Sequence, residues 1–393
     1  MKANQDVIQT SNTLPGGAPD PRQDRGVLPE QTPGFKRAAV KSSDASWLNV
    51  PKGLKKTTIS KALNIPVEQG FNSHCKESSS SWNVAQGQAL PPFPIGRTST
   101  VKLSPSEVCE NIAEGLRRYS VAAIYDSERA EATCQTGCGC IFKVTLFAAG
   151  DPAKTSIEVF RRRGCGLSYS KYQRAIIRFA TGNYEAEKAP CMTIPAEISN
   201  QYVPPGQDYL EKILDDSSME LQQNDQTAQL GALRLLMTIT DETKSHKGSG
   251  EKLAEMIMDG YKGIREICIN LLSSEGKGDF TCLIKRSVLK IFCNSLVLLV
   301  GMNANQTFAD EWYSGSFYPV LMYEIKDCPC PHNLTLIAQC MFLLLSQSAV
   351  LREEAIGGGE LKIILNDALE RGKKTHSKLE VSAERVLNVL ERV

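Results

Sequence analysis

The sequence predicts a multidomain chain. A disordered tail (1–103) precedes a small basic α+β domain (104–182), a linker (183–205) and an all-α solenoid of helical repeats (206–393). Three observations support this prediction. Ten of the 19 prolines precede residue 105, short β-type runs lie between two amphipathic helices, and long apolar runs recur at near-constant spacing towards the end. A chain of 393 residues is long enough for two or three domains.

Bulk composition restricts the class of partner. Hydrophobic residues make up 41% and charged residues 23%, close to a globular average. The net charge of +1 argues against nucleic acid as the partner of the whole molecule. The first 30 residues hold no signal-peptide core, and the longest apolar run, 295–301, is too short for a membrane span. We therefore expect a cytoplasmic protein, with the nucleus as the alternative, whose 13 cysteines are reduced.

The tail lacks apolar periodicity, so burial cannot offset the entropy of ordering it. Within it a group of lysines surrounds several aliphatic residues; the lysines are Lys52, Lys55, Lys56 and Lys61. One interpretation is a basic amphipathic segment that docks on a membrane, a partner or the nuclear machinery. The other is a solvated stretch of tail, which is the commoner fate of such charge runs.

The α+β domain is expected to begin with a helix that has Ser104 as its N-cap and Pro105 at its first position. Three β-type runs follow, at 121–125, 140–147 and 157–163, each bounded by turn residues. A second helix, at about 169–180, is stopped by Gly182. A helix, antiparallel strands and a second helix form a compact pair of layers.

The segment 206–393 is helical in pattern almost throughout. Apolar runs begin at residues 288, 334 and 383, which are separated by 46 and 49 residues. This spacing is near that of helical repeats. Helices that are apolar on most faces need neighbours on both sides, which a stack of repeats supplies. A lone helical bundle is the alternative.

The last part of the chain resembles the armadillo repeat family. Residues 350–365 look like its first two helices, with Gly357 to Gly359 at the sharp corner between them because glycine takes positive φ cheaply. Residues 383–390 resemble the third helix, which lines the concave face in that family. The segment 303–333, with Pro329 and Pro331, departs from the repeat pattern. The resemblance implies an armadillo or HEAT-like solenoid that binds a protein or peptide.

The small domain resembles the kinase-associated C-terminal domain of the MARK and AMP-activated kinase type. The likeness lies in Arg161 to Tyr169, a strand end followed by Arg-x-x-Gly, an aromatic residue and a helix. Several members of that family bind anionic phospholipid or act as autoinhibitory surfaces. In that family the module follows a kinase domain, which this chain lacks, and this weakens any inference about kinase regulation.

Basic residues are concentrated in the small domain. Between residues 141 and 182, eight basic residues face two acidic ones, a net charge of +6. The candidate anion or lipid site consists of Arg161, Arg162, Arg163, Lys171, Arg174 and Arg178. The last three lie at i, i+3 and i+7 on one face of the predicted helix, and arginine suits phosphate. The alternative is a solvated helix face with one arginine paired to an acid.

Two cysteine motifs raise the question of zinc. The first is Cys134-x3-Cys138-x-Cys140 with Cys165 further on, and the second is Cys328-Pro-Cys330-Pro-His332. Structural zinc sites usually offer two well-spaced pairs, which neither motif has. We expect no metal, but a reduced hairpin in the first case and a rigid turn between helices in the second.

Aromatic residues are concentrated between residues 310 and 318. We consider Trp312, Tyr313, Phe317 and Tyr318 as a partner-binding group, because aromatic side chains bury much area at low entropic cost. The alternative, that they fill a gap between repeats, is the commoner role of such residues.

Catalytic signatures are missing from the sequence. The phosphate loop, the zinc-protease motif, the nucleophile elbow and the kinase motifs are all absent, so we expect no enzyme, no cofactor and no small-molecule substrate. The expected function is that of a scaffold or adaptor that holds a protein or peptide in a helical-repeat groove, with the basic domain as a second contact. The alternative is a peripheral membrane protein that docks on anionic phospholipid through that domain.

Overall fold

The computed structural model describes residues 82–85, 87–89, 97–151, 153–185, 206–242, 248–276, 278–301, 313–326 and 328–392. The lysines at 52–61 and Trp312 lie outside these residues, as does most of the predicted linker.

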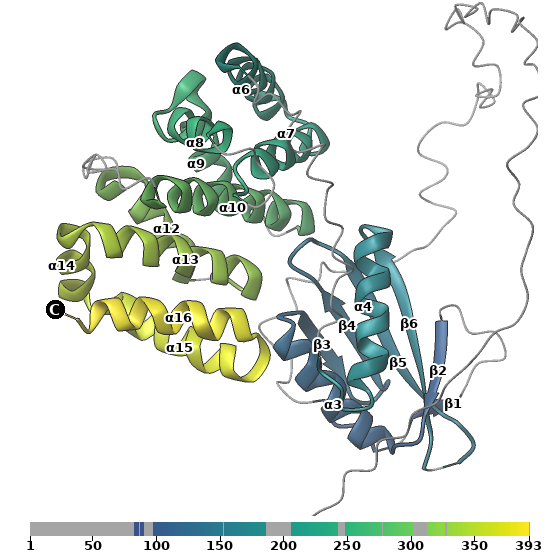
Figure 1. The fold of residues 1–393 in the computed structure, drawn as a ribbon. Coiled ribbons are helices and arrows are strands. Elements are labelled where there is room, and N and C mark those ends of the chain that lie inside the picture. Colours follow the sequence, from purple (N-terminus) through teal and green to yellow (C-terminus); the bar gives the residue numbers. More distant parts are fainter. Residues whose placement is uncertain are drawn as a thin grey trace, which may run out of the picture. The chain divides into compact units, whose positions relative to one another are not determined.

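The first folded part is an antiparallel sheet with two helices, as predicted (Figure 1). The strand order is β2 (Arg97–Val101), β6 (Thr155–Arg163), β5 (Ile141–Ala148), β4 (Glu131–Gln135) and β3 (Ala122–Asp126). A two-residue strand, β1 (Gln88–Ala89), pairs in parallel with the end of β5. The helices α3 (Pro105–Arg118) and α4 (Gly166–Phe179) pack against each other and share one core with the inward side chains of the strands.

The sheet includes residues that the sequence assigned to the tail. β2 pairs with β6 along its whole length, and Trp82 and Val84 are buried in the core of this domain. The domain therefore starts before residue 104. Among the described residues of this segment the buried apolar side chains are Trp82, Val84 and Val101, which give no periodic signal. β4 was also missed, because its inward positions are the small residues Ala132 and Cys134.

Local capping explains where α3 begins. The backbone N–H of Glu107 donates to Ser104 Oγ, and the Glu107 carboxylate accepts from the Ser104 backbone N–H at 2.9 Å, which completes a capping box.

A glycine lies where α3 contacts α4, because a Cβ at Gly115 would overlap the ring of Phe179. Glycine at this position thus lets α3 and α4 approach closely.

The second part is helical and has one continuous hydrophobic core. Its elements are α6 (Gln207–Gln222), α7 (Gln226–Ile239), α8 (Ser249–Met258), the 3-10 turn η2 (Tyr261–Gly263), α9 (Ile264–Leu272), α10 (Asp279–Gly301), η3 (Tyr313–Phe317), α12 (Tyr318–Lys326), α13 (Pro331–Gln347), α14 (Ala349–Gly358), α15 (Glu360–Thr375) and α16 (Ser377–Leu390).

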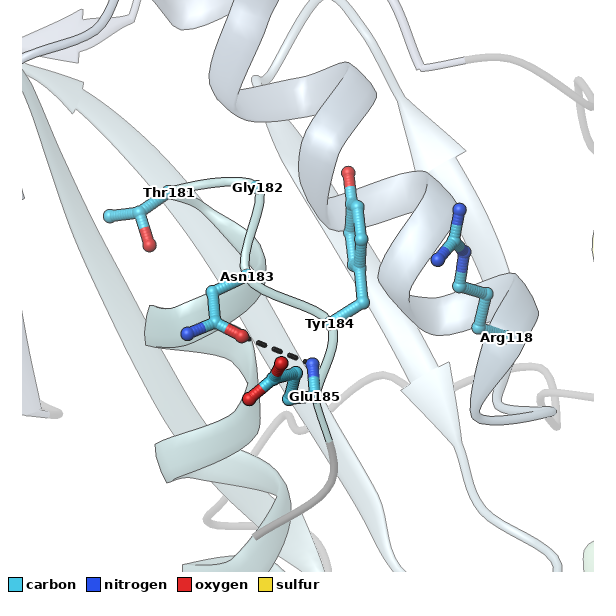
Figure 2. Close-up of a pocket in the computed structure, with 6 residues that line it drawn as sticks. All are labelled: Arg118, Thr181, Gly182, Asn183, Tyr184 and Glu185. Atoms are coloured by element: carbon cyan, nitrogen blue, oxygen red, sulfur yellow. Dashed lines mark hydrogen bonds between the residues drawn. The ribbon is translucent and has the colours of Figure 1, made fainter. Parts of the chain in front are cut away.

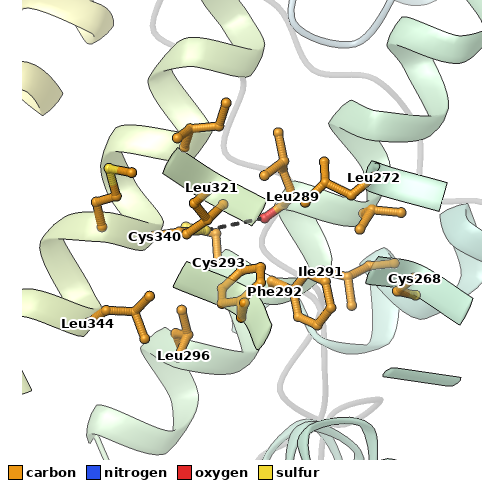
Figure 3. Packing of buried hydrophobic residues seen from close by; sticks show 14 of the residues in the cluster. Cys268, Leu272, Leu289, Ile291, Phe292, Cys293, Leu296, Leu321, Cys340 and Leu344 are labelled. Atoms are coloured by element: carbon orange, nitrogen blue, oxygen red, sulfur yellow. Dashed lines mark hydrogen bonds between the residues drawn. The ribbon is translucent and has the colours of Figure 1, made fainter. Parts of the chain in front are cut away.

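Four of these helices pack in series: α7 contacts α10, α10 contacts α13, and α13 contacts α16. The core between α10 and α13 is aliphatic and thiol-rich, with Phe292, Leu289 and Cys340 all buried (Figure 3). Helix α10 is buried on most of its faces, as its apolar sequence predicts.

The glycine corner lies where the sequence places it. α14 ends at Gly358, and Gly359 takes φ +65° before α15 begins. Residues 383–390 fall in α16, where Ala383 and Val386 are buried. Among the described residues no single helix is long and apolar enough to cross a membrane; α13 and α14 pass that test only as a pair, and they are bent by 120°.

Candidate functional site

The predicted basic residues lie at the end of β6 and along α4. Arg161, Arg162, Lys171 and Arg174 are exposed. Leu167, in the first turn of α4, is 85% exposed. Its neighbour across the turn, the Arg161 guanidinium, lies 6.0 Å from the centre of the Tyr169 ring. We call these four basic residues, together with Leu167, the β6–α4 surface.

Two of the six predicted basic residues do not belong to this surface. Arg163 Nη1 lies 3.8 Å from Asp279 Oδ2, and its guanidinium lies 4.6 Å from the centre of the Phe280 ring. It therefore joins the sheet to the start of α10. Arg178 is half-buried. The anion site of six residues stays a prediction, and in the structure Arg163 contacts an acidic and an aromatic residue of α10.

The aromatic group is not a partner surface where the structure describes it. Phe317 is fully buried, and its ring centre lies 4.6 Å from that of Phe292 on α10. Tyr318 is buried as well. Both side chains fill the helical core, so the partner-binding hypothesis fails for them. The side chains of Trp312 and Tyr313 lie outside the described residues.

The cysteines of the two motifs differ in exposure. In the first, Cys134 and Cys140 are buried and Cys138 is exposed, as is Cys165. In the second, Cys330 and His332 are buried at the start of α13. Within the described part of the chain, no group of three or more His, Cys, Asp or Glu side chains could hold a metal ion.

The most polar buried site, which the sequence did not predict, is centred on Arg286 of α10. Arg286 is only 5% exposed. Its Nη1 donates to the carbonyl oxygens of Thr136 and Gly137, each at 3.2 Å, in the turn between β4 and β5. Its Nε donates to Asn333 Oδ1 at 3.1 Å. One guanidinium thus joins the sheet to both α10 and α13.

Arg286 Nη2 also donates to Gln135 Oε1 at 3.4 Å and contacts two cysteines. Its Nη2 lies 3.0 Å from Cys330 Sγ and 3.8 Å from Cys282 Sγ. Burial alone would raise the pKa of Cys330, but the hydrogen bond from the Cys282 thiol and the charge of Arg286 lower it to about 5. The same hydrogen bond and burial raise the pKa of Cys282. The geometry therefore favours the thiolate form of Cys330, which pairs with the guanidinium.

Two buried histidines continue the network. The backbone N–H of Leu379 donates to Nδ1 of His376, so the proton of that ring lies on Nε2. His376 Nε2 donates to His332 Nδ1 at 3.1 Å, and His332 Nε2 donates to the Gln135 carbonyl at 3.0 Å. All four ring nitrogens have partners and both rings are neutral. This occupies His332, so it does not form a nucleophile pair with Cys330.

Burial makes the neutral state of both rings stable. Burial lowers the pKa of His332 well below its ordinary value, and the charge of Arg286 adds to that effect. Burial and the charge of Lys378 lower the pKa of His376 to about 3. Each ring nitrogen already donates or accepts one hydrogen bond in the series from the Leu379 N–H through His376 and His332 to the Gln135 carbonyl. Protonation of a ring would therefore also place two N–H donors opposite each other.

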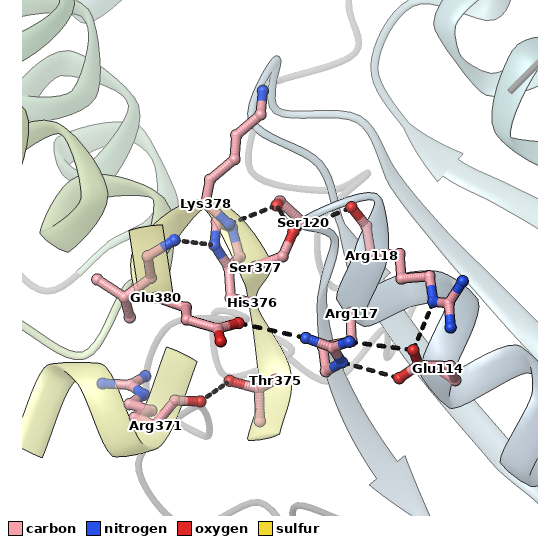
Figure 4. A network of polar contacts seen from close by, with 11 residues as sticks. Glu114, Arg117, Arg118, Ser120, Arg371, Thr375, His376, Ser377, Lys378 and Glu380 are labelled. Carbon is pink, nitrogen blue, oxygen red and sulfur yellow. Dashed lines mark hydrogen bonds and ion pairs between the residues drawn. The ribbon is translucent and has the colours of Figure 1, made fainter. Parts of the chain in front are cut away.

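A second set of contacts joins α3 to the start of α16 (Figure 4). The backbone N–H of Lys378 donates to Ser120 Oγ at 3.0 Å, and Ser377 Oγ donates to the Arg118 carbonyl at 3.0 Å. Arg117 bridges Glu114 at 2.8 Å and Glu380 at 3.4 Å. The hydrogen bond from Arg117 lowers the pKa of Glu114 to about 2.

The starts of three long helices therefore meet the sheet domain. α10 contributes Asp279 and Arg286, α13 contributes His332, and α16 contributes Ser377. We call this set of contacts the junction. Its network uses neither the basic residues nor the aromatic residues that the sequence favoured, with the exception of Arg163.

A separate polar cavity of about 570 Å³ lies after α4 (Figure 2). It is lined by Arg118, Thr181, Gly182, Asn183, Tyr184 and Glu185. The Arg118 guanidinium lies 4.4 Å from the centre of the Tyr184 ring, and Tyr184 donates to Asn111 Oδ1 at 3.2 Å. Arg118 and Tyr184 of the cavity lining thus contact each other, and Tyr184 is also hydrogen-bonded to Asn111. None of the site residues predicted from the sequence lines the cavity.

Comparisons of the chain with protein-family models, with curated proteins and with solved structures find no match. Function is therefore inferred from the geometry of the described residues.

Proposed function

We propose that the chain is a non-enzymatic scaffold that binds a protein or peptide along the series of long helices, with the β6–α4 surface as a second contact. The helical part would be of the armadillo type, which the three-helix group α14, α15 and α16 around the Gly359 corner supports. The order α3, β3, β4, β5, β6, α4 supports the resemblance of the small domain to the kinase-associated module.

A ladder of side-chain hydrogen bonds across all four long helices is the observation that carries this proposal. Asn294 of α10 donates to the Met237 carbonyl of α7 at 3.3 Å. Cys293 Sγ lies 3.6 Å from Gln339 Oε1 of α13, and Gln339 Nε2 donates to Ser382 Oγ of α16 at 3.4 Å. Gln339 is only half-buried. Asn294, Cys293 and Ser382 are buried, so Gln339 is the ladder residue whose remaining amide donor a partner's backbone could use.

Exposed apolar and basic side chains flank the ladder. Leu235 of α7, Val297 of α10 and Val381 of α16 are exposed and lie within about one turn of ladder residues. Arg234 and Arg385 are also exposed on these helices. We call this strip the ladder face. A partner with apolar side chains and some negative charge would suit it, because apolar anchors give affinity and charge gives register.

The test is a selection of peptides on the full chain from a displayed random library. Replacing Leu235, Val297 or Val381 by Glu should weaken binding of the selected peptides about tenfold or more, because each change places a charge where an apolar anchor docks. Affinities are measured by titrating labelled peptide.

Matched controls lie on helices outside the series. Tyr323 of α12 and Ile363 of α15 are at least as exposed, and Tyr323→Glu and Ile363→Glu should leave affinity unchanged. Equal losses in both sets would rule out the ladder face as the binding site.

Docking on anionic phospholipid is a second candidate, favoured by the β6–α4 surface. Leu167 is exposed in the first turn of α4, Lys171 and Arg174 follow it at i+4 and i+7, and no Asp or Glu occurs between residues 159 and 184. An exposed apolar side chain beside basic ones suits the boundary between headgroups and acyl chains.

For this candidate, Arg161→Glu/Arg162→Glu should weaken binding to phosphatidylserine vesicles by about 30-fold, since each lost basic residue removes about 1 kcal/mol. Cosedimentation at low salt measures the effect. Arg163 is left intact because it pairs with Asp279. The control pair Arg129→Glu/Lys154→Glu makes the same charge change on other loops of the domain. If the two pairs lose binding alike, net charge rather than this surface is responsible.

A further inference from the structure

We propose that Cys138 and Cys165 form an oxidation site in which a hydroperoxide converts the two thiols into a disulfide. The site lies beside the β6–α4 surface and does not depend on the proposed function. Both cysteines are exposed, in contrast to Cys134 and Cys140 of the same motif.

Backbone contact brings the two thiols together. After β6 the chain turns at Gly164, which has φ +101°. A Cβ at Gly164 would lie 2.6 Å from Cys140 Cα, so the turn after β6 lies directly on the start of β5. Cys138 precedes that contact by two residues and Cys165 follows it by one. Only glycine permits this approach, and it places the two cysteines on the same side of the sheet end.

A shared hydroxyl group also links the pair. Ser168, in the first turn of α4, hydrogen-bonds both Cys138 and Cys165. Thr136 Oγ1 lies 3.1 Å from Cys138 Sγ on the other side. The two sulfurs therefore converge on one side chain from two strand ends, which no linear spacing in the sequence indicates.

The surroundings favour the thiolate, which is the reactive form. Cys165 is the N-cap residue of α4. The backbone N–H groups of Ser168 and Leu167, at the start of the helix, lower its pKa, and the charge of Arg161 acts in the same direction. Partial burial opposes ionisation of Cys138, but hydrogen bonds with Thr136 and Ser168 lower its pKa below the ordinary value.

The chemistry balances with a hydroperoxide as the oxidant. The Cys165 thiolate attacks one peroxide oxygen, the O–O bond breaks, and hydroxide leaves, so sulfur becomes a sulfenic acid. The Cys138 thiolate then attacks the Cys165 sulfur, the S–O bond breaks, and a second hydroxide leaves as the disulfide forms. The two sulfurs together lose two electrons, which the peroxide takes up.

Neighbouring cysteines serve as internal controls. Burial raises the pKa of Cys109 to about 12, and burial with the charge of Cys138 raises that of Cys140 to about 11. These thiols should stay reduced while the exposed pair reacts, since a thiol reacts through its thiolate.

The experiment treats the reduced full chain with one equivalent of hydrogen peroxide, blocks remaining thiols with N-ethylmaleimide and maps tryptic peptides by mass spectrometry. We expect residues 130–143 and 164–171 as one peptide pair linked through Cys138 and Cys165, released by dithiothreitol. Cys138→Ser should leave a sulfenic acid on Cys165 that dimedone traps, and Cys165→Ser should abolish the link.

Replacing Ser168 tests whether this hydroxyl, and not exposure alone, makes Cys165 reactive. Ser168→Ala should slow alkylation of Cys165 by iodoacetamide at pH 7 several-fold, while Ser170→Ala, two residues on in the same exposed turn, should not. The proposal is overturned if peroxide yields no link between Cys138 and Cys165, or if the link forms only between two molecules. An unfolding midpoint equal to that of the unmodified chain verifies that each serine variant is folded.

Discussion

Replacing Arg286 by Ala should lower the free energy of unfolding by about 3 to 5 kcal/mol. The substitution removes the donors for the Thr136 and Gly137 carbonyls and for Asn333, and it leaves the Cys330 thiolate without its cation. A buried charge that loses its partner keeps its desolvation cost. Urea unfolding at neutral pH measures the change.

The loss should be centred on the junction. Hydrogen exchange of the amides in the turn at 136–140 should quicken more than exchange in β5, because the turn loses its contact with α10 while the sheet keeps its own pairing. The control is Arg385→Ala on α16, which removes an exposed guanidinium. Its free energy of unfolding should stay within about 0.5 kcal/mol of that of the original protein. If Arg286→Ala is as mild as that control, the network is not a stabilising contact.

Much of the fold could be predicted because local signals and tertiary packing agree. Ser104 and Glu107 predict the start of α3, and the structure has the full capping box there. The long apolar run from 288 to 300 predicts a helix covered on most faces, and α10 is such a helix. The antiparallel strands at β3, β5 and β6 follow from turn residues that bound them.

The missed strands depended on distant partners. β2 carries the sequence Arg-Thr-Ser-Thr-Val, which has one buried apolar residue and resembles tail. Only pairing with β6, more than 50 residues later, makes it a strand. Register between distant strands leaves no trace in local periodicity.

The candidate site was hidden for a related reason. Arg286 lies in an apolar helix, where an arginine is expected to reach solvent rather than to be buried. Its acceptors are backbone carbonyls some 150 residues earlier, which carry no residue signature. Cys330 and His332 were noticed as a metal motif, yet the alternating prolines direct Cys330 to Arg286 and His332 to Gln135. The sequence indicates that these residues could form a site, but only the structure shows which residues they contact.

Stability should fall as the pH drops below about 6.5 because of the two junction histidines. In the unfolded chain each takes up a proton near its ordinary pKa of 6.5, whereas folded His376 does so only near pH 3 and folded His332 also well below 6.5. The unfolded state then binds more protons, so the stabilising contribution is full above pH 6.5 and is lost as the pH falls. Between pH 7 and pH 5 the loss is about 2 kcal/mol for His376, and His332 adds to it in the same direction.

Urea unfolding at pH 5, 6, 7 and 8 measures this loss, and a double variant isolates its source. His332→Gln keeps a donor and an acceptor, and His376→Asn keeps a good N-cap for α16. Cys330, whose pKa of about 5 lies within this range, is present in both proteins, so its slope is common to the two curves. The free energy of unfolding of the double variant should therefore change less between pH 7 and pH 5 than that of the original protein, by at least about 2 kcal/mol. If the free energies of unfolding of the two proteins change in parallel with pH, the rings are not held neutral in the folded chain. The hydrogen-bonded series from Leu379 to Gln135 would then contain one more proton than the structure indicates.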